Sequence, residues 1–129
     1  MDLTGLRVMV IDDSNTIRRS AEIFLGQAGC DVVLAEDGFD ALAKIADHQP
    51  DVIFMDIMMP RLDGYQTCAL IKRNARLAAT PVIMLSSKDG LFDRARGRMA
   101  GSSEYLTKPF TKDSLLKTVA EHAVRAKTD

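Results

Sequence analysis

The sequence predicts an α/β domain built on a doubly wound, five-stranded parallel sheet with helices on both faces. Three observations support this prediction. Short apolar runs alternate with stretches of helical spacing along the chain. The runs are nearly continuous in Val, Ile, Leu, Met and Phe, which is typical of strands buried on both faces. The 129 residues fit one compact domain of about 100–150 residues, so we expect a single domain over residues 1–129 without an output domain.

The predicted strands are four apolar runs and one short, mixed segment near the C-terminus. They span residues 6–11, 32–35, 52–55, 81–85 and 103–107. Parallel strands joined through helices follow right-handed connections. We therefore expect the strand order 2-1-3-4-5 of the flavodoxin-like arrangement.

The first helix is predicted from apolar residues that recur at i, i+4, i+7, i+8 and i+11. These residues are Ile17, Ala21, Phe24, Leu25 and Ala28. Ser14 can cap the start of this helix and Gly29 its end.

The second helix should follow Asp37 and end before Pro50, because a proline excludes the preceding residue from a helix. It carries Ala41, Leu42, Ile45 and Ala46. The third helix is expected over about 64–73, with Cys68 and Ile71 buried.

The last two helices are predicted to follow a turn and a capping residue. The fourth should begin after Asp89-Gly90 and bury Phe92, Ala95 and Met99. The fifth should begin after the cap Thr111 and bury Leu115, Leu116, Val119 and Ala123.

The bulk composition excludes several classes of protein. An apolar fraction of 47% and a net charge of −1 describe an ordinary globular domain with no field that attracts nucleic acid or an anionic membrane. No apolar run approaches the roughly 20 residues of a membrane span, and the start lacks a leader pattern, so we expect a cytoplasmic location. Cys30 and Cys68 form no Cys-x-x-Cys pair and are expected to be buried, reduced thiols.

Polar residues gather at the predicted carboxyl ends of the strands, the edge at which open parallel sheets bind ligands. They are Asp12, Asp13, Asp56, Ser86 and Lys108. Any one of them could be a helix cap, a turn or a surface residue, but crowded carboxylates repel one another unless a cation is present. Mg²⁺ suits such a site and also binds phosphate oxygens. A carboxylate can then act as a nucleophile and form an aspartyl-phosphate.

Five motifs resemble the receiver domains of two-component response regulators, of the chemotaxis (CheY-like) single-domain type. They are residues 10–14 (VIDDS), 54–60 (FMDIMMP), 63–64 (DG), 81–86 (PVIMLS) and 105–110 (YLTKPF). The resemblance covers the whole chain. It implies a phospho-accepting signalling domain and no metabolic enzyme, although such a domain assists its own Mg²⁺-dependent phosphorylation and dephosphorylation.

The resemblance also implies a role for each residue at the strand ends. Asp56 would be the phospho-acceptor. Asp13, Asp56 and the backbone carbonyl of Met58 would bind Mg²⁺, for which Mn²⁺ can substitute, and Asp12 would orient a metal-bound water. Lys108 would pair with the transferred phosphoryl group.

Two further features follow from the same resemblance. The Ser86 hydroxyl would bind a phosphoryl oxygen, and Tyr105 would turn inward when that hydroxyl moves. The bond between Lys108 and Pro109 would be cis and direct the ammonium toward Asp56, the alternative being an ordinary trans turn.

Two positions of the family tune the lifetime of the phosphoryl group, and Met58 and Lys88 occupy them here. We expect the apolar Met58 to hinder attacking water.

Four stretches resemble the PilG-type regulators of type IV pilus twitching motility: residues 14–19, 37–42, 61–68 and 85–93. This implies a sensor histidine kinase or histidine phosphotransfer domain as phospho-donor and a downstream protein such as the pilus machinery. A flagellar chemotaxis regulator and a phosphorelay sink are the alternatives. The fourth helix is basic, because it carries Arg94, Arg96 and Arg98. This face is either an output surface near Tyr105 or simply a solvated face. We expect the protein to be a monomer or a weak dimer through the fourth and fifth helices.

Other classes fit the residues less well, although the fold alone does not exclude them. A flavin-binding enzyme or small phosphatase is disfavoured by the missing Gly-x-Gly-x-x-Gly, the absence of Trp and the lack of an Asp-x-Asp alternation. Ser86 lacks the Gly-x-Ser-x-Gly elbow of a hydrolase. A DNA-binding regulator would need a further recognition element.

Overall fold

The computed structural model describes residues 2–87 and 94–128, with side chains as far as residue 123. Five strands form one parallel sheet in the order β2-β1-β3-β4-β5, so the predicted topology is confirmed. The strands are β1 (Arg7–Ile11), β2 (Asp31–Ala35), β3 (Val52–Asp56), β4 (Val82–Ser87) and β5 (Glu104–Lys108).

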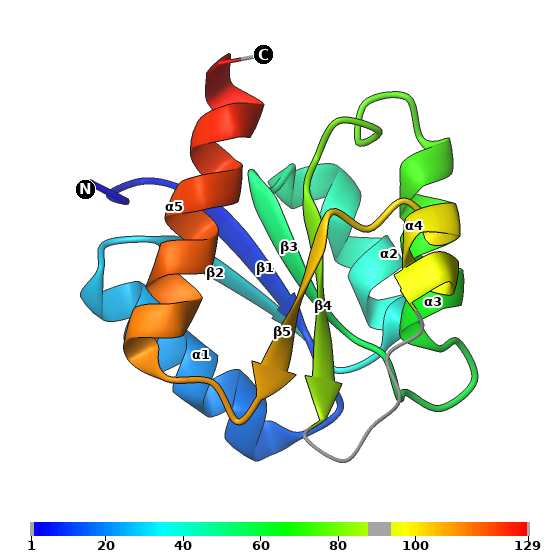
Figure 1. Ribbon diagram of the computed structural model, residues 1–129, viewed down its shortest axis with the longest axis horizontal. Helices are drawn as coiled ribbons and strands as arrows, with labels where there is room; N and C mark the ends of the chain where they lie inside the picture. The colour runs from blue at the N-terminus through cyan, green and yellow to red at the C-terminus, as the bar shows by residue number, and fades with distance from the viewer. Residues whose placement is uncertain (1, 88–93, 129) are drawn as a thin grey trace.

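Helices cover both faces of this sheet (Figure 1). On one face lie α1 (Asn15–Gln27) and α5 (Lys112–Thr128), and on the other α2 (Gly38–His48), α3 (Gly64–Arg73) and α4 (Arg94–Ala100). Successive strand side chains point to opposite faces, which divides the core in two. In β1, Val8 and Val10 pack with α1 and α5, whereas Met9 and Ile11 pack with α2 and α3.

The central strands owe their apolar sequence to this double coverage. All five residues of β3 are buried, including Asp56, the last of them. The edge strands β2 and β5 are only partly buried. Both cysteines are buried and free, as predicted.

The helix boundaries follow from local hydrogen bonds. The Ser14 hydroxyl accepts from Ile17 N at 3.3 Å and begins α1, and Gly29 follows its end with a φ of 87°. Thr111 caps α5 by accepting from Ser114 N at 3.0 Å. All three roles were predicted from the sequence. No helix among the described residues is long and apolar enough to cross a lipid bilayer.

The predicted buried face of α4 is wrong. Ala95 is exposed and Met99 is 88% exposed, while Gly97 and Ala100 are buried instead. The helix approaches α3 through these small residues, and the Cys68 thiol of α3 donates a hydrogen bond to the Ala100 carbonyl at 3.3 Å. The predicted start at Asp89-Gly90 and the predicted contact of Phe92 lie outside the described residues.

Candidate functional site

The parallel strands bring their carboxyl ends to one edge of the sheet, where the arrowheads of Figure 1 lie. Asp12 and Asp13 follow β1, Asp56 ends β3, Ser86 lies near the end of β4 and Lys108 ends β5. Asp12 is fully buried and Asp56 is 3% exposed, whereas Asp13 faces solvent. Four strands therefore place the predicted residues at one site.

The three carboxylates form a tight cluster. Oxygen atoms of Asp12, Asp13 and Asp56 all lie within 4.8 Å of one another. The Lys108 ammonium donates to Asp12 Oδ2 at 3.1 Å and to Asp56 Oδ1 at 2.9 Å. Lys108 thus pairs with two of the three carboxylates, and these three acidic groups and one ammonium together carry an excess of negative charge.

Electrostatics at the cluster follow from burial and crowding. Burial raises the pKa of Asp56 to about 6; the hydrogen bond from Lys108 opposes this rise, and the charge of Asp12 adds to it. Burial disfavours the charged form of Lys108, but its hydrogen bond to Asp56 and the two carboxylate charges outweigh burial and raise its pKa. Asp56 is therefore a carboxylate whose ionised form a bound cation would stabilise.

A cavity of about 230 Å³ opens beside the cluster. Its lining includes Asp13, Asp56, Met58, Ser86 and Lys108. Such a volume is several times the roughly 30 Å³ that one water occupies in the liquid, so the cavity has room for a phosphoryl group. Met58 lies at the rim and is 76% exposed.

Backbone contacts hold the loop between β3 and α3 against Asp56. Gly64 N donates to the Ile57 carbonyl at 2.8 Å. A Cβ at Gly64 would lie 2.3 Å from the Asp56 carbonyl oxygen, a distance that real Cβ atoms do not adopt. Only glycine therefore allows the loop to return this close to the strand.

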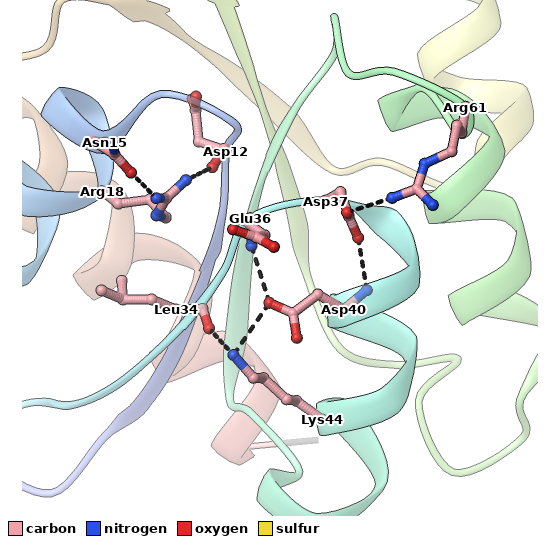
Figure 2. Close-up of polar contacts among 9 residues, drawn as sticks. All are labelled: Asp12, Asn15, Arg18, Leu34, Glu36, Asp37, Asp40, Lys44 and Arg61. Atoms are coloured by element: carbon pink, nitrogen blue, oxygen red, sulfur yellow. Dashed lines mark hydrogen bonds and ion pairs between the residues drawn. The ribbon is translucent and has the colours of Figure 1, made fainter.

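Sequence reasoning missed Arg18. Its guanidinium donates to the Asp12 carbonyl oxygen at 2.6 Å and to the Asn15 side chain, and so fixes the turn after β1 (Figure 2). The sole signal in the sequence was its place one turn into a helix that follows an acidic pair.

Tyr105 lies on β5 and does not line this cavity. Its hydroxyl accepts a hydrogen bond from Arg94 at 2.7 Å, and the same guanidinium lies 5.0 Å from the ring centroid. The bond between Lys108 and Pro109 is cis, the isomer that the family resemblance implied. Lys88 lies outside the described residues.

Comparison with known proteins decides the family. A model described as the response regulator receiver domain matches residues 8–120. The chain belongs to this family. It is therefore a signalling domain, its membership implies a histidine kinase as a partner, and members generally bind Mg²⁺.

Individual relatives agree with this assignment. Protein PilG of Pseudomonas aeruginosa is 70% identical over 118 residues, which are 92% of this chain and 87% of PilG. Protein PilH of the same organism is 38% identical over 113 residues, which are 88% of this chain and 93% of PilH. The chemotaxis protein CheY4 of Vibrio cholerae is 32% identical and superposes with a TM-score of 0.87 over 92% of this chain and 99% of CheY4. The predicted similarity to PilG-type regulators is confirmed.

Proposed function

We propose that this receiver domain accepts a phosphoryl group on Asp56 from a sensor histidine kinase or a histidine phosphotransfer domain. The observation that carries the proposal is the position of the Asp56 carboxylate. It lines an open cavity, lies within 4.8 Å of two other carboxylates and accepts a hydrogen bond from Lys108. A nucleophile, a counter-charge and room for a phosphoryl group thus meet at one place.

The residues present fit a magnesium ion. Three carboxylates against one ammonium leave uncompensated negative charge, and oxygen is the ligand that Mg²⁺ prefers. The ion would be bound by Asp13, Asp56 and the Met58 carbonyl, and Asp12 would orient a water molecule bound to the ion. Mn²⁺ can replace Mg²⁺ at this site. The bound ion would screen the nucleophile from the charge of the incoming phosphoryl group.

The side chains then divide the work of transfer. An Asp56 carboxylate oxygen forms a bond to phosphorus as the phosphorus–nitrogen bond of the donor histidine breaks, and the electron pair stays on that nitrogen. The Lys108 ammonium pairs with one phosphoryl oxygen, and the Ser86 hydroxyl turns from the Ser87 carbonyl, 3.3 Å away, to donate to another. The inward turn of Tyr105 requires the loss of its hydrogen bond to Arg94.

The proposed pathway is the control of type IV pilus twitching motility through a downstream protein such as the pilus machinery. The 70% identity to PilG supports this proposal. A flagellar chemotaxis regulator or a phosphorelay sink would share the same site. We further propose a cytoplasmic, single-domain protein that is a monomer or a weak dimer through α4 and α5 and binds neither nucleic acid nor membrane.

The phosphorylation site can be tested with Mg²⁺, acetyl phosphate and intact mass measurement. We expect the mass of one phosphoryl group in the native protein, no gain in Asp56→Asn, and an unchanged gain in the control Asp47→Asn, which alters an exposed residue of α2. An equal gain in Asp56→Asn would refute the site.

The pathway needs a genetic test. Loss of surface twitching on deletion of the gene, restored by the native gene and not by Asp56→Asn, is the expected result. Loss of swimming with normal twitching would favour the flagellar alternative.

A further inference from the structure

Arg61 occupies a strained place at the tip of the loop between β3 and α3. Its φ is 69°, in the left-handed region that residues other than glycine rarely adopt. The next residue closes the turn around it, since Leu62 N donates to the Pro60 carbonyl at 2.8 Å. A strained residue of this kind persists only where its surroundings hold it.

The side chain of Arg61 supplies the contacts that hold it. Its guanidinium donates to Asp37 Oδ2 at 2.7 Å (Figure 2). The same guanidinium lies 5.0 Å from the centroid of the Phe39 ring. The other oxygen of Asp37 accepts from Asp40 N at 2.7 Å and begins α2. The loop tip is therefore tied to a fixed helix end, and glycine, although free of strain at this φ, could make neither contact.

The start of α2 also packs closely against Leu62 of the loop and Thr67 of α3. A Cβ at Gly38 would lie 2.4 Å from Thr67 Oγ1 and 3.0 Å from the Leu62 Cβ. The base of the loop is closed by the hydrogen bond from Gly64 N to the Ile57 carbonyl. The segment between base and tip contains Met58, which lines the cavity beside the acidic cluster and whose carbonyl is a proposed metal ligand.

We propose that Arg61 is a positioning residue, which clamps the loop to the start of α2 through Asp37 and Phe39 and so holds the Met58 carbonyl in place for Mg²⁺. This inference rests on the proposed function. The ion pair is a poor device for global stability, because 65% of the Arg61 side chain is exposed and exposed pairs contribute little. A role in fixing the loop explains why a charged residue tolerates the left-handed backbone.

The clamp can be broken from either side without disturbing the fold. Arg61→Gly removes the side chain and relieves the backbone, and Asp37→Ser removes the partner charge and keeps a cap for α2. By calorimetric titration we expect each to weaken Mg²⁺ binding by roughly tenfold, the lower end of losses for groups that support metal ligands. The double variant should lose no more than either single variant, and Arg61→Lys should recover part of the affinity.

Two controls separate positioning from stability. Arg19→Ala removes an exposed arginine with an ion pair to Glu22 on α1 and should leave Mg²⁺ affinity unchanged. The urea midpoint of metal-free Arg61→Gly should equal that of the native protein, because a lost exposed pair is offset by relieved strain.

Three outcomes would overturn the inference. If Arg61→Gly and Asp37→Ser bind Mg²⁺ with the affinity of the native protein and are still phosphorylated on Asp56, the clamp is refuted and the proposed function stands. Independent, multiplying losses in the double variant show that the two residues do not act together. Failure of the native protein to bind Mg²⁺ or to gain a phosphoryl group refutes the proposed function and the clamp with it.

Discussion

Asp56→Asn should make the metal-free protein more stable at neutral pH. Burial raises the pKa of Asp56 from 3.8 to about 6, so the folded state disfavours the ionised carboxylate relative to the unfolded chain. The native protein therefore keeps its full stability below about pH 4 and loses part of it as the pH rises through 6. A neutral amide of the same shape avoids this loss.

The magnitude follows from the same values. A rise from 3.8 to about 6 corresponds to about 3 kcal/mol at 1.36 kcal/mol per pKa unit. Solvent screens little of this, because the Asp56 side chain is 4% exposed. Lys108 keeps its contact to Asp12 at 3.1 Å in the variant, so the substitution leaves no unpaired ammonium.

Urea unfolding in a chelating buffer at several pH values checks the prediction. The free energy of unfolding of Asp56→Asn should exceed that of the native protein by about 3 kcal/mol at pH 7.5, and the two should converge near pH 4. Added Mg²⁺ should narrow the gap, because it stabilises the state that binds it and the variant lacks a ligand. Asp47→Asn is the matched control. A variant less stable than the native protein at pH 7.5, or a gap independent of pH, would refute the reasoning.

Three other outcomes are expected. Gly64→Ala should lower the free energy of unfolding by about 2 kcal/mol or more, in the upper part of the usual range of single-site losses, because its Cβ would lie 2.3 Å from the Asp56 carbonyl oxygen. The control Gly26→Ala meets nothing within 4 Å and should stabilise α1 by up to about 1 kcal/mol. Equal urea midpoints of the two variants would contradict this prediction. Met58→Ala should lose its phosphoryl group faster than Met58→Leu in a decay assay, and equal rates would show that the side chain does not hinder water. Burial raises the pKa of Cys68 to about 11, so iodoacetamide at pH 8 should label this thiol far more slowly in the native protein than in urea, as peptide mass mapping can measure.

The strands and their order could be predicted from the sequence because the burial of apolar side chains determines them. Continuous apolar runs such as that ending at Asp56 arise from burial on two faces, and right-handed connections leave few strand orders. The prediction for α4 failed because this helix is seven residues long and packs through the small residues Gly97 and Ala100. In so short a helix, the apolar character of Met99 does not indicate burial.

The acidic cluster could be predicted because topology alone brings strand ends together. The contacts of Arg18 and Arg61 could not, because a long side chain chooses its partner in space and leaves no spacing in the sequence. The chemical role assigned to each cluster residue came from family resemblance.

The site takes its ammonium from β5, whose residue Lys108 lies 96 positions after its partner Asp12. Synthesis runs from the N-terminus, so a growing polypeptide on the ribosome holds the carboxylates of β1 and β3 before it holds their counter-charge. An interrupted translation product that ends before residue 104 lacks the lysine and the cap of α5 together. Under the proposed function, such a product would hold the carboxylates of the site without the ammonium that pairs with the phosphoryl group.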